Sequence, residues 1–166
     1  MAETADGQST SGPFGTLLAF WALLGGLVLL AVVLMNTVSV VGAAFGKPFP
    51  GDFELTQMGV AVAAFTFLPY CQLTRANVTA DIFTSRVSPR SVALLSAIAS
   101  VVALIFGALL AWRMYAGMLD QKTYGYTTAI LQVPHWWAFV PILISLVLWV
   151  TASAYMVVRD VKLTGR

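Results

Sequence analysis

The feature that most constrains this sequence is a set of four long runs that carry almost no charged side chain. The stretch from Leu55 to Thr74 holds 20 residues without a charge, and the stretch from Ser91 to Trp112 holds 22. A bilayer core about 30 Å thick requires roughly 20 apolar residues at 1.5 Å rise per residue. We therefore predict an all-α integral membrane protein with four transmembrane helices, at about residues 17–41, 55–74, 91–112 and 134–158.

The composition agrees with a chain whose outer surface faces lipid. Hydrophobic residues make up 59% of the 166 residues and charged residues 10%, whereas an average soluble domain is about 25% charged. The net charge of +2 is small, and the basic residues lie between the apolar runs rather than in one patch. These observations argue against a nucleic-acid partner and in favour of membrane lipid.

The chain divides simply into a tail and one domain. Residues 1–12 are mostly small and polar, with no aromatic or branched aliphatic side chain to bury, which is typical of a flexible N-terminal tail. Residues 13–166 contain no linker and no repeat of fixed period, so we predict a single four-helix transmembrane domain.

Small and polar residues within the apolar runs indicate close helix contacts. Gly25 and Gly26 lie near the middle of the first run and Asn36 towards its end, while Gly59 and Ala63 are four apart in the second. Small residues let two backbones approach closely, and an amide in hydrocarbon seeks a partner on another helix. The contacts lie either within this chain or with another subunit, and both interpretations remain open at this point.

The segment between the second and third runs has a different pattern. Its apolar residues Ala76, Ala80, Phe83 and Val87 fall on one narrow helical face, with Asp81 opposite. This pattern favours a short helix that lies in the membrane interface. An extended strand is the alternative, but its edge would leave backbone groups unpaired.

The basic residues predict the orientation. With four spans, both termini and the middle segment share one side and hold six basic residues against three on the other. The positive-inside rule then places both termini in the cytoplasm. The six are Arg75, Arg86, Arg90, Arg159, Lys162 and Arg166, and the three are Lys47, Arg113 and Lys122.

Residue types that carry chemistry are sparse. His135 is the single histidine, which argues against a haem held by two histidines and leaves an interfacial role. None of the four runs has an ionisable residue at its centre, although such residues normally mark ion or proton paths. We therefore predict a non-catalytic scaffold or partner subunit without a cofactor. Glu54 and Asp81 are either solvated or paired with another chain.

Three motifs resemble the small membrane subunit, often called DctQ-like, of the tripartite ATP-independent periplasmic (TRAP) transporters. Gly51-x-x-Glu54-Leu55-Thr56 opens the second run, and Arg75-Ala76-Asn77-Val78-Thr79-Ala80-Asp81 follows it. The third motif enters the last run, where Leu131-Gln132-Val133-Pro134 precedes His135 and the interfacial pair Trp136 and Trp137. The resemblance covers nearly the whole chain in the number and order of its spans. Asn77 stands where many members have histidine.

The resemblance implies a function and partners. A large membrane subunit would carry an organic acid, probably a carboxylate, inward with sodium bound in that subunit. A periplasmic binding protein would deliver the acid, and this chain would brace the large subunit in a bacterial inner membrane. Glu54 and Gln132 would face the periplasm, while Asp81 and Arg75 would brace the frame inside.

Two other function classes are weighed against this one. A free-standing four-helix assembly or channel protein has the same helix pattern, and only the motifs argue against it. A small membrane-embedded enzyme or redox subunit is disfavoured by the single histidine and by the lack of acids within the spans.

Overall fold

The computed structural model describes residues 12–74 and 89–164, apart from the side chains of residues 89–97 and 160–164. The described elements are four helices: α2 (Pro13–Ala44), α3 (Asp52–Leu73), α5 (Pro89–Thr123) and α6 (Trp136–Thr164). The predicted all-α fold is therefore confirmed. The interfacial helix predicted after the second run, including Arg75 and Asp81, lies outside the described residues, as does most of the N-terminal tail.

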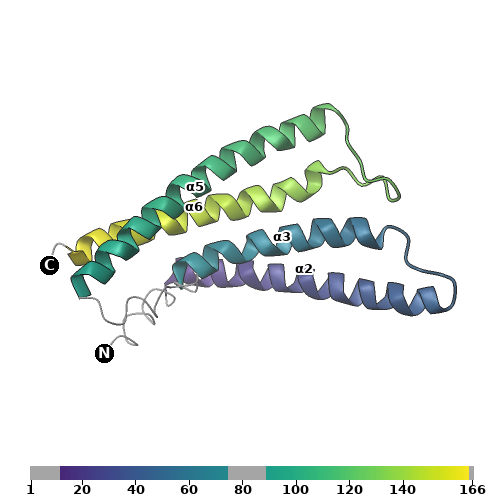
Figure 1. The fold of residues 1–166 in the computed structure, drawn as a ribbon, viewed down its shortest axis with the longest axis horizontal. Coiled ribbons are helices and arrows are strands. Elements are labelled where there is room, and N and C mark those ends of the chain that lie inside the picture. The colour runs from purple at the N-terminus through teal and green to yellow at the C-terminus, as the bar shows by residue number, and fades with distance from the viewer. Residues whose placement is uncertain (1–11, 75–88, 165–166) are drawn as a thin grey trace.

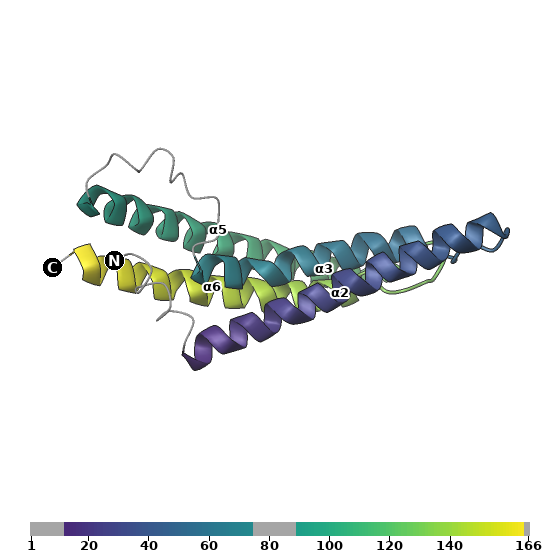
Figure 2. The same ribbon diagram turned by 90° about the horizontal axis from the view of Figure 1, so that it is seen from below.

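The helices form two hairpins, α2 with α3 and α5 with α6, and α3 packs against α6 to join them (Figure 1). The start of α2 and the end of α6 lie towards one end of the molecule, and both hairpin connections lie towards the other (Figures 1 and 2). We call the second of these the loop end; it carries residues 45–51 and 124–135. The up-and-down order of the helices gives α3 a protein neighbour on two sides.

Three of the four helices are long and apolar enough to cross a membrane, over Pro13–Ala44, Ile98–Thr123 and Trp136–Arg159. The 22-residue helix α3 is not among them. Two of its polar side chains, Thr66 and Gln72, are buried inside the protein. The crossing predicted for the second run stays a prediction.

Two helices have ends that differ from those of the predicted spans. The third span was predicted to end at about residue 112, but α5 continues to Thr123. The long side chain of Arg113 can snorkel towards water from within a helix, so its charge does not end the helix. Helix α6 begins at Trp136 rather than at Pro134, because Pro134 instead forms an antiparallel bridge with Thr127.

Several small residues serve contacts within the chain. A Cβ added at Gly25 would overlap Thr66 of α3, and one added at Gly59 would overlap Val32 of α2. Gly107 likewise lies against Trp149 and its neighbour on α6. The question left open by the sequence is answered for these glycines: they let helices of the same chain approach closely.

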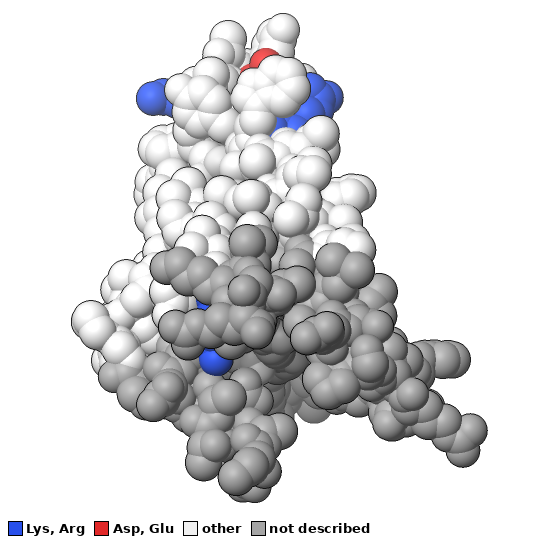
Figure 3. Space-filling view, turned by 90° about the vertical axis from the view of Figure 1, so that its left-hand side faces the viewer, with Lys and Arg blue, Asp and Glu red and all other residues white. Residues whose placement is uncertain are grey.

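Large apolar side chains cover much of the outer surface. Exposed fractions reach 68% at Leu23 on α2 and 60% at Ile105 on α5. Seen from the end opposite the loop end, the described surface carries few charged side chains (Figure 3). This surface is suited to lipid or to other membrane-embedded protein.

Candidate functional site

The candidate site is a carboxylate clamp at the loop end. Glu54, in the first turn of α3, accepts hydrogen bonds from two successive backbone N–H groups of the α5–α6 connection. Ile130 N lies 2.7 Å from Glu54 Oε1, and Leu131 N lies 3.1 Å from Glu54 Oε2. One side chain thus fastens the first hairpin to a loop that follows it by 76 residues.

The loop is shaped by its own hydrogen bonds. Thr128 N donates to Val133 O at 2.9 Å, and Val133 N donates to the Thr128 hydroxyl at 3.0 Å. His135 N donates to Tyr126 O at 3.1 Å and closes the base of the loop. These bonds occupy other donors of the loop, while the N–H groups of residues 130 and 131 are bonded to the carboxylate.

Gln132 holds the turn of this loop. Its φ of 56° lies in the left-handed region, which a residue with a side chain rarely adopts. Two hydrogen bonds of the Gln132 side-chain amide stabilise this backbone conformation. Nε2 donates to Ala129 O at 3.0 Å, and Oε1 accepts from the Thr127 hydroxyl at 3.0 Å. The predicted site residue Gln132 therefore lies beside the Glu54 clamp and shapes its loop.

Gly51 completes the contact from the other side. It precedes α3 with φ of 77°, a conformation that favours glycine. A Cβ added here would overlap the side chain of Leu131, so the absence of a side chain is also needed for packing. Gly51 and Glu54, three residues apart, thus contact the same loop through packing and hydrogen bonds respectively.

Residues 32–163 match the family of tripartite ATP-independent periplasmic transporters, DctQ component. The chain belongs to the DctQ family. No curated protein and no solved structure matches it. The matched region contains both halves of the clamp, so a membrane-transporter component carries this contact.

The pKa of Glu54 in this DctQ chain reflects two opposing effects. Partial removal from water raises the pKa of the carboxyl, but hydrogen bonds from the Ile130 and Leu131 N–H groups and the Thr128 hydroxyl lower it more. The net pKa is lowered, so the clamp holds a carboxylate at neutral pH. Glu54 precedes the predicted span 55–74 and can keep its charge at the membrane surface.

A second polar cluster ties α2 to α3 near the clamp. The buried hydroxyl of Ser39 donates to Asp52 Oδ2, and Asn36 Nδ2 donates to Thr56 Oγ1 at 2.7 Å. Asn36 was singled out from the sequence as an amide in need of a partner, and the structure places that partner on the next helix. The role of Asp52 was missed, because a serine 13 residues earlier gives no sequence signal that identifies it as the partner.

The two predicted aromatic anchors, Trp136 and Trp137, open α6 next to the clamp loop. Their rings lie 6.2 Å apart edge to face, and the ammonium of Lys122 lies 5.5 Å from the Trp136 ring centre. Trp137 is 58% exposed. The loop end of this DctQ chain therefore presents aromatic and basic groups beside the hydrogen-bonded, ionised carboxylate of Glu54.

A cavity of about 380 Å³ adjoins the clamp. Glu54, Gln57, Thr127 and His135 contribute polar groups to its wall, together with apolar side chains such as Phe53. Within the residues that the structure describes, no three His, Cys, Asp or Glu side chains come together as a metal site would require. The polar and apolar walls of this cavity suit protein contact.

Proposed function

We propose that this chain is the non-catalytic small subunit of a TRAP transporter and braces the large membrane subunit during transport. The family match over residues 32–163 carries the proposal. In it, a periplasmic binding protein captures an organic acid, probably a carboxylate, and docks outside. The large subunit then moves the acid inward together with sodium.

The proposal includes four crossings of the bacterial inner membrane, with both termini in the cytoplasm. Helix α3 lies between α2 and α6 and buries the polar side chains of Thr66 and Gln72. A helix covered by protein on two sides needs fewer apolar residues than one surrounded by lipid. The six-to-three division of basic residues supports the orientation.

The ties between the two hairpins support a bracing role. The Glu54 clamp joins them at the loop end. Within the apolar region, Trp21 Nε1 donates to the buried Ser145 hydroxyl at 2.9 Å, and Trp149 Nε1 donates to Gln72 Oε1 at 3.4 Å. These hydrogen bonds lie at different positions along the helices, so together they resist both sliding and splaying of the two hairpins. A stationary frame requires such resistance.

The lack of charges at the centres of the four runs supports the same division of labour. Transported ions and anionic solutes need polar or charged partners inside the membrane. We expect sodium and the organic acid to bind in the large subunit, and we expect this chain to need no cofactor. Glu54, Gln132 and Trp137 would then help to form the surface on which the binding protein docks, while Arg75 and Asp81 would brace the inner side.

Reconstituted uptake tests the proposal. Proteoliposomes that contain the large subunit, the binding protein and this chain should accumulate substrate under an inward sodium gradient. Omitting this chain should abolish uptake, and the tagged chain should co-purify with the large subunit in mild detergent. Uptake undiminished without this chain would count against the bracing role. Substrate flux through this chain alone would favour the alternative of a free-standing channel.

A further inference from the structure

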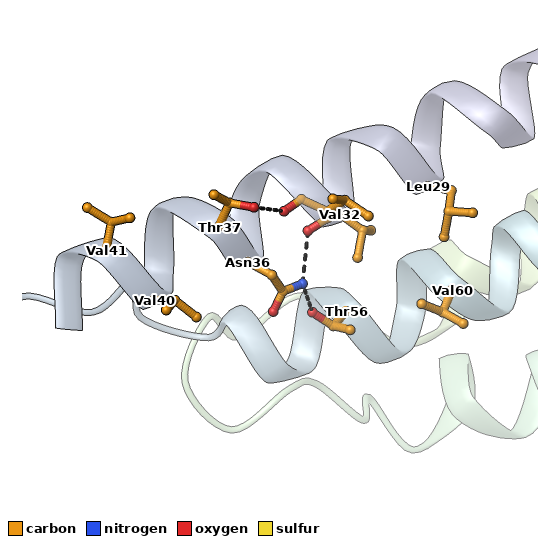
Figure 4. A pocket seen from close by; sticks show the side chains of 9 residues that line it. Leu29, Val32, Asn36, Thr37, Val40, Val41, Thr56 and Val60 are labelled. Atoms are coloured by element: carbon orange, nitrogen blue, oxygen red, sulfur yellow. Dashed lines mark hydrogen bonds between the residues drawn. The ribbon is translucent and has the colours of Figure 1, made fainter. Parts of the chain in front are cut away.

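Two apolar hollows lie along the seam between α2 and α3, and we call them together the groove. The one near the loop end has a volume of about 540 Å³ and is lined by Leu29 and Val40 of α2 and Val60 of α3 (Figure 4). A second hollow of about 460 Å³ continues the same side of the seam towards the opposite end. Its α2 wall includes Ala19, Ala22 and Gly26, and its α3 wall is Phe67 and Tyr70.

Most α2 residues of the groove repeat with the period of a helix–helix seam. Seven of the eleven α2 residues that line the two hollows fall at alternating steps of three and four, which is the a and d spacing of a heptad, and the other four flank them. From Ala19 to Val40 this seam runs 21 residues, or about 32 Å along a helix, close to the thickness of the bilayer core. The seven positions are Ala19, Ala22, Gly26, Leu29, Val33, Asn36 and Val40.

This open seam runs directly beside the seam that α2 uses against α3. The α3 contacts fall at Gly25, against Thr66, at Val32, against Gly59, and at Asn36, which bonds Thr56 from the edge of the groove. Gly26 lies one position away from the first of these, and a Cβ added there would meet nothing within 4 Å. The groove therefore has room for another backbone to approach α2 closely.

One polar atom in the groove requires a partner that lipid tails do not provide. The amide nitrogen of Asn36 donates to Val32 O at 2.9 Å and to Thr56 Oγ1 at 2.7 Å, which uses both of its hydrogens (Figure 4). The amide oxygen has no hydrogen-bond donor among the described residues. Acyl chains carry no donor, whereas a side chain of a neighbouring helix can supply one.

The outer face of α5 offers a contrast. It exposes large side chains, including Val102, Ile105 and Phe106, and its small residue Gly107 is already used against α6. A face of large apolar side chains is well solvated by lipid. The groove on α2 instead combines small residues, a heptad spacing and an acceptor to which no described residue donates.

We propose that the α2–α3 groove receives one transmembrane helix of the large membrane subunit. That helix lies along α2, fills the groove with aliphatic side chains, and places a hydrogen-bond donor opposite the Asn36 amide oxygen. This inference rests on the proposed function and adds the face through which the subunits meet.

Site-specific photocrosslinking in the co-expressed complex tests the inference. A benzophenone amino acid is placed at Val40, which lines the groove, and at Val38, which lies on the same helix outside it and is similarly exposed, at 64% against 73%. A third probe at Phe106 reports on the outer face of α5. We expect an adduct with the large subunit from Val40 and little or none from the other two positions.

Other crosslinking patterns overturn the inference in distinguishable ways. One such pattern is a complex that co-purifies and gives adducts from Val38 or Phe106 but none from Val40. That result rejects the groove as the contact face and leaves the proposed function intact. Lipid adducts alone from Val40 in that complex do the same. If the large subunit neither co-purifies nor crosslinks anywhere, the proposed function fails and this inference with it.

Two further substitutions separate a blocked interface from a damaged fold. Val40→Trp fills the groove and should reduce co-purified large subunit severalfold, whereas Val38→Trp should leave it unchanged. Asn36→Val should weaken the complex about threefold, because an interhelical hydrogen bond contributes roughly 0.6 kcal/mol. Thr56→Val controls for the bond that Asn36 makes within the chain. Equal complex yields from Asn36→Val and Thr56→Val would contradict the donor opposite Asn36.

Discussion

The loop end and the apolar region of this DctQ-family protein are held together by different chemistry. At the loop end a charged side chain, Glu54, binds backbone N–H groups of the other hairpin. Within the apolar region the ties are neutral, from Trp21 to Ser145 and from Trp149 to Gln72, and glycines such as Gly25 permit close packing. The difference arises because a charged side chain is strongly unfavourable in hydrocarbon, so a carboxylate is tolerated only where water is near.

The largest effect that tests this comparison should come from packing in the apolar region. Gly25→Ala places a methyl group into Thr66 and should lower the free energy of unfolding by about 2 kcal/mol, as overpacked cores do. Gly26→Ala is the matched control, because its added methyl meets nothing within 4 Å. Unfolding of the isolated chain in mixed micelles measures both. Equal stabilities would show that the glycine contact with α3 is not close.

The next effect should appear at the loop end. Glu54→Ala leaves the N–H groups of Ile130 and Leu131 without their acceptor and should raise their hydrogen-exchange rates by about tenfold or more. Glu54→Gln keeps the shape but loses the charge, so its rates should lie between those of the wild type and the alanine variant. Unchanged exchange in Glu54→Ala would contradict the clamp. Exchange near the Trp21–Ser145 tie should not change in either variant.

The pH dependence should separate the two regions further. The folded pKa of Glu54 is lowered from its ordinary value of 4.5, so the clamp contributes fully above pH 4.5 and is lost as the pH falls through the lower, folded value. Exchange protection at Ile130 should follow this curve. The neutral tie between Trp21 and Ser145 should be insensitive over the same range. Loss of the loop contact near neutral pH would contradict a carboxylate held by backbone hydrogen bonds.

The smallest effect should come from one neutral bond. Ser145→Ala removes the acceptor of Trp21 and should destabilise the chain by about 0.6 kcal/mol, the average for hydrogen bonds between membrane helices. Ser153→Ala is the control, since its buried hydroxyl lacks a hydrogen-bond partner within the described chain. That variant should be neutral or slightly stabilised. A larger loss of stability from Ser153→Ala than from Ser145→Ala would contradict the stabilising role of the Trp21–Ser145 bond.

The length and apolarity of the runs were sufficient to predict four helices, because both are properties of local sequence. The end of α5 was placed too early at Trp112, since a following arginine can belong to a helix as well as to a loop. Gly25 and Gly26 are equivalent in the sequence, and only the register of α2 against α3 distinguishes the packed glycine from the open one.

Part of the site could also be predicted. Glu54 and Gln132 were both named from motifs at the starts of their spans, but the contact between their segments was not. The partners of Glu54 are backbone N–H groups, which every residue except proline carries and which leave no mark in a sequence. The left-handed turn at Gln132 that shapes this loop is likewise invisible without the folded chain.

The clamp also orders events during synthesis. The ribosome makes Glu54 well before Ile130 and Leu131, so the carboxylate lacks these two hydrogen-bond donors until the second hairpin has been translated. A nascent chain that ends before residue 130 therefore carries this acid without its native loop partners, and formation of the contact marks a polypeptide whose α5–α6 connection has packed against the start of α3.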